Sequence, residues 1–270
     1  MRADLHRRDT IIAMSDITVI DISRHQGEID FNVMKAAGAV GVAMRATIGN
    51  YYIDPNFYIN WDKAGAAGLF RTAYHVVKPS KTVASQMQHF SDAVGDRHPD
   101  FGIGGWVLDC ELDDGMDKRT ITDNIWGCAT KFSDHCGLDV FIYTRMSWFN
   151  TFTYPGEWDN WPLWVARYTS APEPWSDDDP DYLKPRPDEW DDWAMWQYSA
   201  DGNGQGAFYG ASSPDIDINH AKDWIFAGET PPTPPDELPK HLSAKIIAVE
   251  EENGFYKAEL VISKDWIPGV

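Results

Sequence analysis

The chain has 270 residues, of which 43% are hydrophobic and 24% charged, and this ordinary globular composition excludes a wholly disordered chain, a collagen and a coiled coil. Its 42 acidic and 23 basic residues give a formal net charge of −19, and a polyanion of this kind repels nucleic acid and acidic membranes. No uncharged apolar run approaches the roughly 18 residues that a membrane helix needs. We therefore expect neither nucleic acid nor a membrane as a partner.

Residues 1–16 precede the first strand-like run. Arg7 and Arg8 are followed only by the short apolar run Ile11–Met14, which is too short for the apolar core of an export signal. We expect an N-terminal extension here, and a protein made in the cytoplasm without a signal peptide. Another route would then carry it to any substrate outside the cell.

The three cysteines, Cys110, Cys128 and Cys136, form no Cys-x-x-Cys motif, which argues against a zinc ribbon and against a redox motif. A disulfide between Cys128 and Cys136 would satisfy the spacing. Reduced, buried thiols are the preferred interpretation.

Up to about residue 145, short apolar runs alternate with segments of helical spacing. This alternation is typical of a parallel sheet that is buried on both faces. The predicted strands are Thr18–Ser23, Gly41–Thr47, Leu69–Val76, Gly105–Cys110 and Val140–Thr144. The predicted helices are Phe31–Ala37, Asn56–Ala67, Lys81–Val94 and Thr120–Cys136.

Past residue 150 the pattern changes, because irregular polar segments separate the strands. Three more strands are predicted at Leu163–Ala166, Ala194–Tyr198 and Asp215–Ile218, followed by a helix at His220–Phe226. The acidic, proline-rich stretch Pro172–Asp192 indicates a long solvated loop. Eight strands are the number that closes a barrel. We therefore predict an α/β fold, a modified TIM-like (β/α)5(β)3 barrel, over residues 17–227.

The C-terminal part has a different composition. Residues 228–240 contain five prolines in thirteen positions and indicate a stiff, extended linker. Residues 241–270 contain two alternating stretches, Ser243–Val249 and Phe255–Ile262, joined by a hairpin turn at Glu251–Gly254. About 30 residues are too few for an independent core. We expect this small β-rich tail to dock on the barrel or on a partner.

In a closed parallel barrel, the active site lies at the carboxyl ends of the strands. Carboxylates, aromatic rings and hydrogen-bonding groups stand at or near these positions. The candidate site residues are Asp21, Tyr74, His75, Asp109, Glu111, Tyr143, Trp196, Gln197, Asp215 and Asp217.

Asp109 and Glu111 are the sharpest feature, because they follow directly on the apolar run Trp106–Leu108. Residues i and i+2 of a strand point to the same face, about 7 Å apart. Two carboxylates that close raise the pKa of one of them, and a raised carboxyl suits a general acid at neutral pH. Cleavage of a glycosidic bond needs such an acid and a group that stabilises the positively charged sugar centre.

Each of these acids also has a structural interpretation. Asp109 and Glu111 could end a strand and bind backbone amides or an arginine, and Asp21 taken alone fits a structural role. Asp215 and Asp217 could cap the last helix.

Other chemistries find less support. A carboxylate cluster can bind calcium or magnesium, but no EF-hand loop is present, and we expect no metal and no cofactor. There is no Gly-x-Ser-x-Gly motif, and Cys110 is expected to face the core. Gly202–Gly206 lacks the lysine of a phosphate loop.

The order of short motifs along the chain is informative. The first strand Ile20–Ser23 is followed by His25–Gly27 and Ile29–Phe31. The later motifs are Arg45–Thr47, Ala73–His75, Leu108–Glu111, Ile142–Thr144, Trp164–Ala166, Trp196–Ser199 and Asp215–Asn219. Together they resemble glycoside hydrolase family 25, the N-acetylmuramidase-type lysozymes of phages, bacteria and fungi. The resemblance covers about residues 17–226.

This resemblance implies cleavage of the β-1,4 bond between N-acetylmuramic acid and N-acetylglucosamine in peptidoglycan, with net retention. It implies Glu111 as general acid and then base, and Asp109 as the residue that orients and stabilises the substrate's N-acetyl group. Asp21 and Asp217 would complete the acidic cleft. Either the acetamido oxygen or an aspartate could attack the anomeric carbon. The residues suited to stack on sugar faces are Tyr74, Tyr143, Trp164 and Trp196.

The chain departs from the family pattern at Ile48, where the family usually has Glu, and at Arg45, where Lys is common. Arg167–Tyr168 follows the Trp-Val-Ala motif where an aromatic residue often comes first. Two other functions therefore stay open, a non-catalytic glycan-binding module and a hydrolase of another polysaccharide. A muramidase without a signal peptide would be a phage lysin released through a membrane lesion, or a wall hydrolase carried on a virion.

Overall fold

The computed structural model describes residues 17–101, 105–136, 140–168, 186–200, 202–226, 245–252 and 255–261. The chain divides into two compact units, Met1–Pro232 and Thr233–Val270. Most of the stretch 172–192, the whole of the linker 228–240 and the extension 1–16 lie outside the described residues. The predicted domain boundaries stay predictions.

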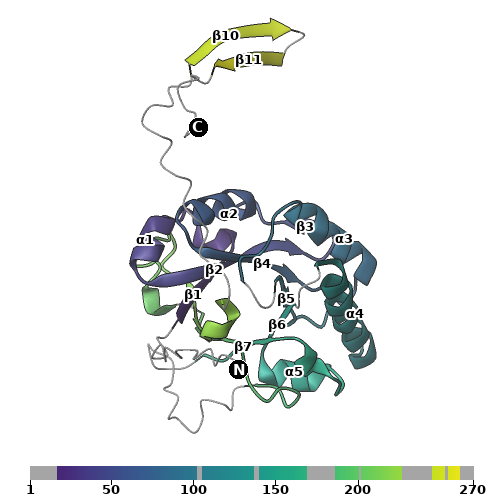
Figure 1. Ribbon diagram of the computed structural model, residues 1–270. Coiled ribbons are helices and arrows are strands. Elements are labelled where there is room, and N and C mark those ends of the chain that lie inside the picture. Colours follow the sequence, from purple (N-terminus) through teal and green to yellow (C-terminus); the bar gives the residue numbers. More distant parts are fainter. Residues whose placement is uncertain are drawn as a thin grey trace, which may run out of the picture. The chain divides into compact units, whose positions relative to one another are not determined.

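Eight strands of the first unit close into a barrel, as predicted (Figure 1). Their order around the barrel is β1-β9-β8-β7-β6-β5-β4-β2, and β2 pairs back onto β1. The strands are β1 (Ile17–Ile22), β2 (Ala39–Ile48), β4 (Phe70–Val76), β5 (Val107–Asp109), β6 (Phe141–Thr144), β7 (Leu163–Ala166), β8 (Met195–Ser199) and β9 (Asp217–Ala221). A short strand, β3 (Tyr52–Ile53), pairs antiparallel with the end of β2.

Helices connect the first six barrel strands and cover the outside of the barrel (Figure 1). Side-chain caps start several of them: Asp30 accepts hydrogen bonds from the amides of Asn32 and Val33, and Thr82 accepts one from Ser85. The helices are α1 (Phe31–Ala36), α2 (Phe57–Ala66), α3 (Val83–Val94), α4 (Lys118–Cys136) and α5 (Met146–Phe152), of which α5 was not predicted. Short 3₁₀ turns occur at η1 (Arg24–Gln26), η2 (Trp158–Asn160), η3 (Gly202–Gly204) and η4 (Asp223–Phe226).

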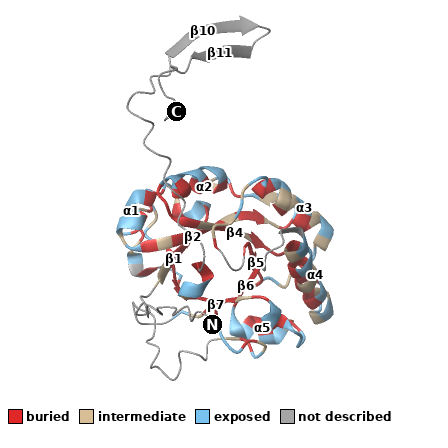
Figure 2. Cartoon of the chain, viewed as in Figure 1, coloured by how far each residue is buried: buried red, intermediate tan, exposed pale blue. Residues whose placement is uncertain are grey.

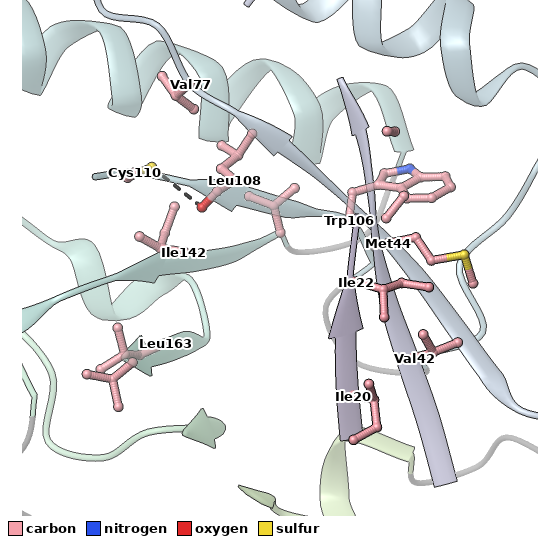
Figure 3. Close-up of a cluster of buried hydrophobic side chains, with 14 of the residues drawn as sticks. Ile20, Ile22, Val42, Met44, Val77, Trp106, Leu108, Cys110, Ile142 and Leu163 are labelled. Atoms are coloured by element: carbon pink, nitrogen blue, oxygen red, sulfur yellow. Dashed lines mark hydrogen bonds between the residues drawn. The ribbon is translucent and has the colours of Figure 1, made fainter. Parts of the chain in front are cut away.

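The strands are buried on both faces, and Figure 2 colours most of their length as buried. Alternate residues therefore serve two different apolar clusters. The outer cluster lies between the strands and the helices and includes Ile20, Val42 and Leu108 (Figure 3). The inner cluster fills the barrel and includes Phe101 and Phe141. Whether a strand residue contacts the outer or the inner cluster thus depends on its odd or even position along the strand.

The last barrel strand differs from the prediction. The predicted strand Asp215–Ile218 corresponds to β9, which spans Asp217–Ala221 and so starts two residues later and ends three residues later. The predicted helix His220–Phe226 was wrong, since β9 runs to Ala221 and only the 3₁₀ turn η4 follows it. β9 is antiparallel to both β1 and β8. The start of β9, not its end, therefore lies at the same mouth as the carboxyl ends of the parallel strands.

The second unit is described only as a hairpin. Strand β10 (Lys245–Glu252) pairs antiparallel with β11 (Phe255–Val261), and the predicted organisation of the tail stays a prediction. Its docking partner stays a prediction.

Cys110 and Cys128 are free and buried, which agrees with the interpretation of reduced, buried thiols, and the side chain of Cys136 lies outside the described residues. Among the described residues, no helix has the length and apolar character that crossing a membrane requires.

Candidate active site

A pocket of about 350 Å³ opens at the mouth where the parallel strands end. Among its lining residues are all four acids predicted to be catalytic, Asp21, Asp109, Glu111 and Asp217. Four of the predicted substrate-binding residues line it as well: Tyr74, Tyr143, Trp164 and Gln197. Seven barrel strands, or the residues that directly follow them, thus contribute predicted side chains to one pocket.

Asp21 and Asp217 form one carboxyl pair, since they are direct partners in the antiparallel pairing of β1 with β9. Burial, together with the charge of the neighbouring Asp21 carboxylate, raises the pKa of Asp217 to about 9. At neutral pH, Asp217 therefore carries the proton and donates a hydrogen bond to Asp21. The two carboxyls thus share a proton through this hydrogen bond.

Two side-chain amides fix the Asp21 carboxylate. Its Oδ2 accepts hydrogen bonds from Gln197 Nε2 at 2.9 Å and from Asn219 Nδ2 at 2.8 Å. Trp164 Nε1 in turn donates to Asn219 Oδ1 at 2.8 Å, and Tyr143 OH donates to Gln197 Oε1 at 2.8 Å. Burial raises the pKa of Asp21, while these amide donors lower it. The network orients Asp21 rigidly at the base of the pocket.

Asp109 is in a contrasting environment. It is 9% exposed, and its Oδ1 has no hydrogen-bond partner although the atom is buried. Burial raises the pKa of Asp109 well above its usual range, and the charges of Glu111 and Asp21 add to this rise. A buried oxygen without a donor is costly, by about 1–3 kcal/mol. A ligand N–H in the pocket would supply the missing donor.

Glu111 follows β5 by two residues and lies at the exposed side of the pocket, with 31% of its side chain accessible. Burial raises the pKa of Glu111, and the Arg145 guanidinium, whose Nε lies 3.4 Å from Oε2, opposes that rise. The net pKa lies above the ordinary value of 4.5. In Glu111 the protonated form is therefore favoured relative to a free glutamate, and the side chain can exchange its proton with solvent.

Arg45 brings a positive charge to the pocket from β2. It is held by Asp54, whose Oδ2 lies 2.9 Å from Arg45 Nε and 2.8 Å from its Nη2. Asp54 is itself 1% exposed and also accepts a hydrogen bond from the Arg24 amide at 3.1 Å. The Arg45 charge lowers the pKa values of Asp109 and Tyr74, against the larger effect of burial.

Several pocket residues were not predicted as site residues. Arg45, Tyr168, Ser23, His25 and Gln26 line the pocket, and Arg145 contacts Glu111. Each stands within four residues of a predicted strand end or site residue, and this proximity is the signal that could have found them. Asn219 also went unrecognised, because it lies inside β9.

Three predicted substrate-binding residues do not line this pocket. His75 points to the outer side of β4, where its ring nitrogens contact Thr47 Oγ1 at 2.7 Å and Gln86 Oε1 at 3.3 Å. Trp196 belongs to the outer apolar cluster and donates from Nε1 to the Arg167 carbonyl at 2.8 Å. Each of these two residues directly adjoins an inward-facing residue in its strand. Because successive side chains of a strand point to opposite faces, His75 and Trp196 point outward.

Asp215 is the third of these residues. It is exposed and precedes β9, and its amide donates to Ser213 Oγ at 3.2 Å. Ile48, which replaces the usual family glutamate, does not line the pocket either and pairs with Tyr52 in the β2–β3 sheet. Over the described ranges, no three His, Cys, Asp or Glu side chains are arranged to hold a metal.

Comparisons with known proteins agree with this geometry. The sequence profile described as "Glycosyl hydrolases family 25" matches residues 20–207. Lysozyme M1 of Streptomyces globisporus is 32% identical over 170 residues, which cover 58% of this chain and 57% of that protein. The N,O-diacetylmuramidase of a Chalaropsis species is 30% identical over 173 residues, which cover 56% of this chain and 78% of that protein.

The solved structures give the same result. The bacterial lysozyme from Streptomyces coelicolor has a TM-score of 0.61 at 29% identity, and the match covers 77% of this chain and 92% of that one. The chain spans only about half the length of the first two curated relatives it matches, 57% of one and 44% of the other. From the profile match, the closed barrel and the acidic pocket together, the chain belongs to glycosyl hydrolases family 25.

Proposed function

We propose that this protein is a muramidase that cleaves the β-1,4 bond between N-acetylmuramic acid and N-acetylglucosamine in peptidoglycan. The observation that carries the proposal is the convergence of Asp21, Asp109, Glu111 and Asp217 on one pocket. Family membership and the lysozyme and muramidase names of the relatives support the same reaction.

Glu111 is the proposed general acid. Its raised pKa favours the protonated form that a general acid needs, and its partial exposure allows reprotonation from solvent. In the first step the Glu111 proton passes to the oxygen of the departing sugar as the glycosidic C–O bond breaks. In the second step the Glu111 carboxylate takes a proton from the attacking water.

Asp109 is the proposed partner of the substrate's acetamido group. Its unpaired Oδ1 would accept a hydrogen bond from the acetamido N–H, which turns the acetamido oxygen toward the anomeric carbon. Burial favours the protonated form of Asp109 in the empty pocket, whereas the positive charge that develops on the acetamido group in the transition state would favour the ionised form. The negative charge of ionised Asp109 would then stabilise that positive charge.

We favour the route in which the acetamido oxygen is the nucleophile. Asp21 is the alternative nucleophile, but its Oδ2 already accepts two amide hydrogen bonds and Asp217 donates to the same carboxylate. These bonds lower the nucleophilicity of Asp21 and suit it to a fixed electrostatic role. Attack by the acetamido oxygen and then by water, each from the opposite face, gives net retention.

Digestion of purified peptidoglycan tests the proposal. We expect new reducing ends at muramic acid, and no comparable release from chitin or from plain glucans. Release of ends from one of these other polysaccharides alone would identify a different hydrolase. Binding of peptidoglycan by folded protein without any release would identify a glycan-binding module and would contradict the proposed activity.

We further propose the bacterial cell wall as the place of action, with peptidoglycan glycan strands as the partner. A released phage lysin and a virion-carried wall hydrolase both fit this activity, and the tail 241–270 would bind a wall or virion component. Removal of residues 241–270 tests this role. We expect weaker sedimentation with whole cell walls and unchanged cleavage of a short soluble glycan.

A further inference from the structure

The loop between β5 and α4 carries Glu111, and its first residues are fixed by the neighbouring strand. The Cys110 amide donates to the Tyr143 carbonyl at 2.8 Å, and Thr144 Oγ1 donates to the Cys110 carbonyl at 2.7 Å. These two bonds hold the residue before Glu111 against β6. They leave open what holds the residues after it.

Asp114, three residues after Glu111, fixes the other side of the loop. Its carboxylate pairs with Lys78 Nζ and accepts hydrogen bonds from the Ser80 amide at 3.2 Å and from Ser80 Oγ at 2.7 Å. Only 10% of the Asp114 side chain is exposed. Partial burial raises its pKa, but the hydrogen bonds from Lys78 and Ser80 outweigh this effect and the net pKa is lowered. Asp114 is therefore an anion held in place by groups from another loop.

The backbone at Asp114 is unusual as well. Its φ of 50° is the only positive φ of a non-glycine residue among the described residues. Such a conformation is uncommon outside glycine, although Asp and Asn adopt it more readily than other residues. It persists where surrounding contacts fix it. The contacts to Lys78 and Ser80 are the ones that fix it here.

Lys78 is itself positioned by a buried polar network. Its amide donates to Gln86 Oε1 at 2.7 Å, and the same oxygen lies 3.3 Å from His75 Nε2. Burial lowers the pKa of His75 to about 4, so the ring is neutral. A Cβ at Gly49 would lie 2.9 Å from Lys78 Cγ, so only glycine leaves room for the Lys78 stem at this position. The loop that holds Asp114 is thus rigid.

We propose that Asp114 is a positioning residue for Glu111: by joining the β5–α4 loop to Lys78 and Ser80 of the β4–α3 loop, it fixes where the catalytic carboxyl points. This inference rests on the proposed muramidase function. Asp114 does not line the pocket, so it acts through the loop and not on the substrate. Small displacements of a catalytic group have large effects, since a 1 Å misplacement can cost on the order of a hundredfold in rate.

The first test is Asp114→Asn, because Asn tolerates a positive φ but lacks the charge. On a soluble peptidoglycan oligosaccharide we expect kcat to fall at least about tenfold while KM changes less than about twofold. Asp123→Asn, which removes an exposed carboxylate on α4, is the matched control and keeps wild-type kcat. An Asp114→Asn variant with wild-type kcat would overturn the inference.

Lys78 provides the second test. Lys78→Met should lower kcat as Asp114→Asn does, and the double variant should lose no more than either single variant, because both break one contact. Lys78→Arg should restore most of the rate. Independent, additive losses would contradict the inference, as would a Lys78→Met loss that appears entirely in KM.

Two further outcomes keep the test decisive. If Asp114→Asn does not fold, Ser80→Ala removes one partner at the edge of the contact and should still lower kcat severalfold at constant KM. If wild type and Asp123→Asn both fail to release reducing ends, the proposed function fails, and this differs from the failure of Asp114→Asn to change an active enzyme.

Discussion

The pocket contains two carboxyl pairs with opposite surroundings. Asp21 and Asp217 share one proton, and Asp21 receives amide donors from both Gln197 and Asn219. Asp109 and Glu111 come from one chain segment, and the buried Oδ1 of Asp109 receives no donor.

The first pair therefore has a structural role, whereas the second pair has groups that remain free to interact with a substrate. Protein donors satisfy the first pair, so it can orient charge but has little capacity left for a ligand. The second pair keeps an open acceptor and a solvent-reachable carboxyl, which are the groups a substrate can use. Both pairs face the same pocket because β9 is antiparallel and its first residue lies beside the strand ends.

The largest effect is expected at Glu111. Glu111→Gln keeps the size of the side chain but cannot donate a proton to the leaving sugar. We expect turnover on peptidoglycan to fall at least about a hundredfold, because a positioned acid contributes roughly 10² to 10⁴. Release of reducing ends measures it, and near wild-type turnover would exclude Glu111 as the acid.

Asp217→Asn tests the shared proton through stability. The folded protein keeps this proton up to about pH 9, whereas an Asp with the ordinary pKa of 3.8 loses it in the unfolded chain. Between these values the folded state binds more protons, so stability falls as pH rises. Asn can still donate to Asp21 and does not titrate.

We therefore expect the unfolding midpoint of Asp217→Asn to rise relative to wild type between pH 5 and pH 8, by roughly 2–4 °C per kcal/mol gained. Calorimetry at several pH values measures it. If the difference in unfolding midpoint between Asp217→Asn and wild type does not change with pH, Asp217 does not bind an additional proton in the folded state.

The smallest effect is expected at Arg145, whose guanidinium lowers the pKa of Glu111. A general acid works only while protonated, so activity is lost as pH rises through that pKa. Arg145→Met should move the alkaline limb of the kcat/KM profile to higher pH. The shift should be less than about one unit, since both side chains are partly exposed and screened. Arg119→Met, exposed on α4, is the control, and an unmoved limb in Arg145→Met would contradict the account.

Strand pattern and motif order predicted the barrel and all four acids. They could do so because carboxyl ends of parallel strands share one mouth. The same reasoning placed Asp217 in the pocket for a wrong reason, since this residue begins an antiparallel strand instead of ending a parallel one.

The errors have a common cause. His75 and Trp196 adjoin the pocket residues Tyr74 and Gln197, and the two-residue alternation of a strand turns neighbours to opposite faces. A strict use of this alternation would have excluded both. The contacts of Asp114 and Arg145 join segments 30 or more residues apart, so no local pattern could predict them.

The most direct test of the contrast between the two pairs is a crystal structure of Glu111→Gln with a bound peptidoglycan oligosaccharide. We expect an acetamido N–H within hydrogen-bond distance of Asp109 Oδ1, and unchanged bonds from Gln197 and Asn219 to Asp21. A glycan bound with Asp109 Oδ1 still unpaired, or one that displaces Gln197 and Asn219 to reach Asp21, would contradict the account.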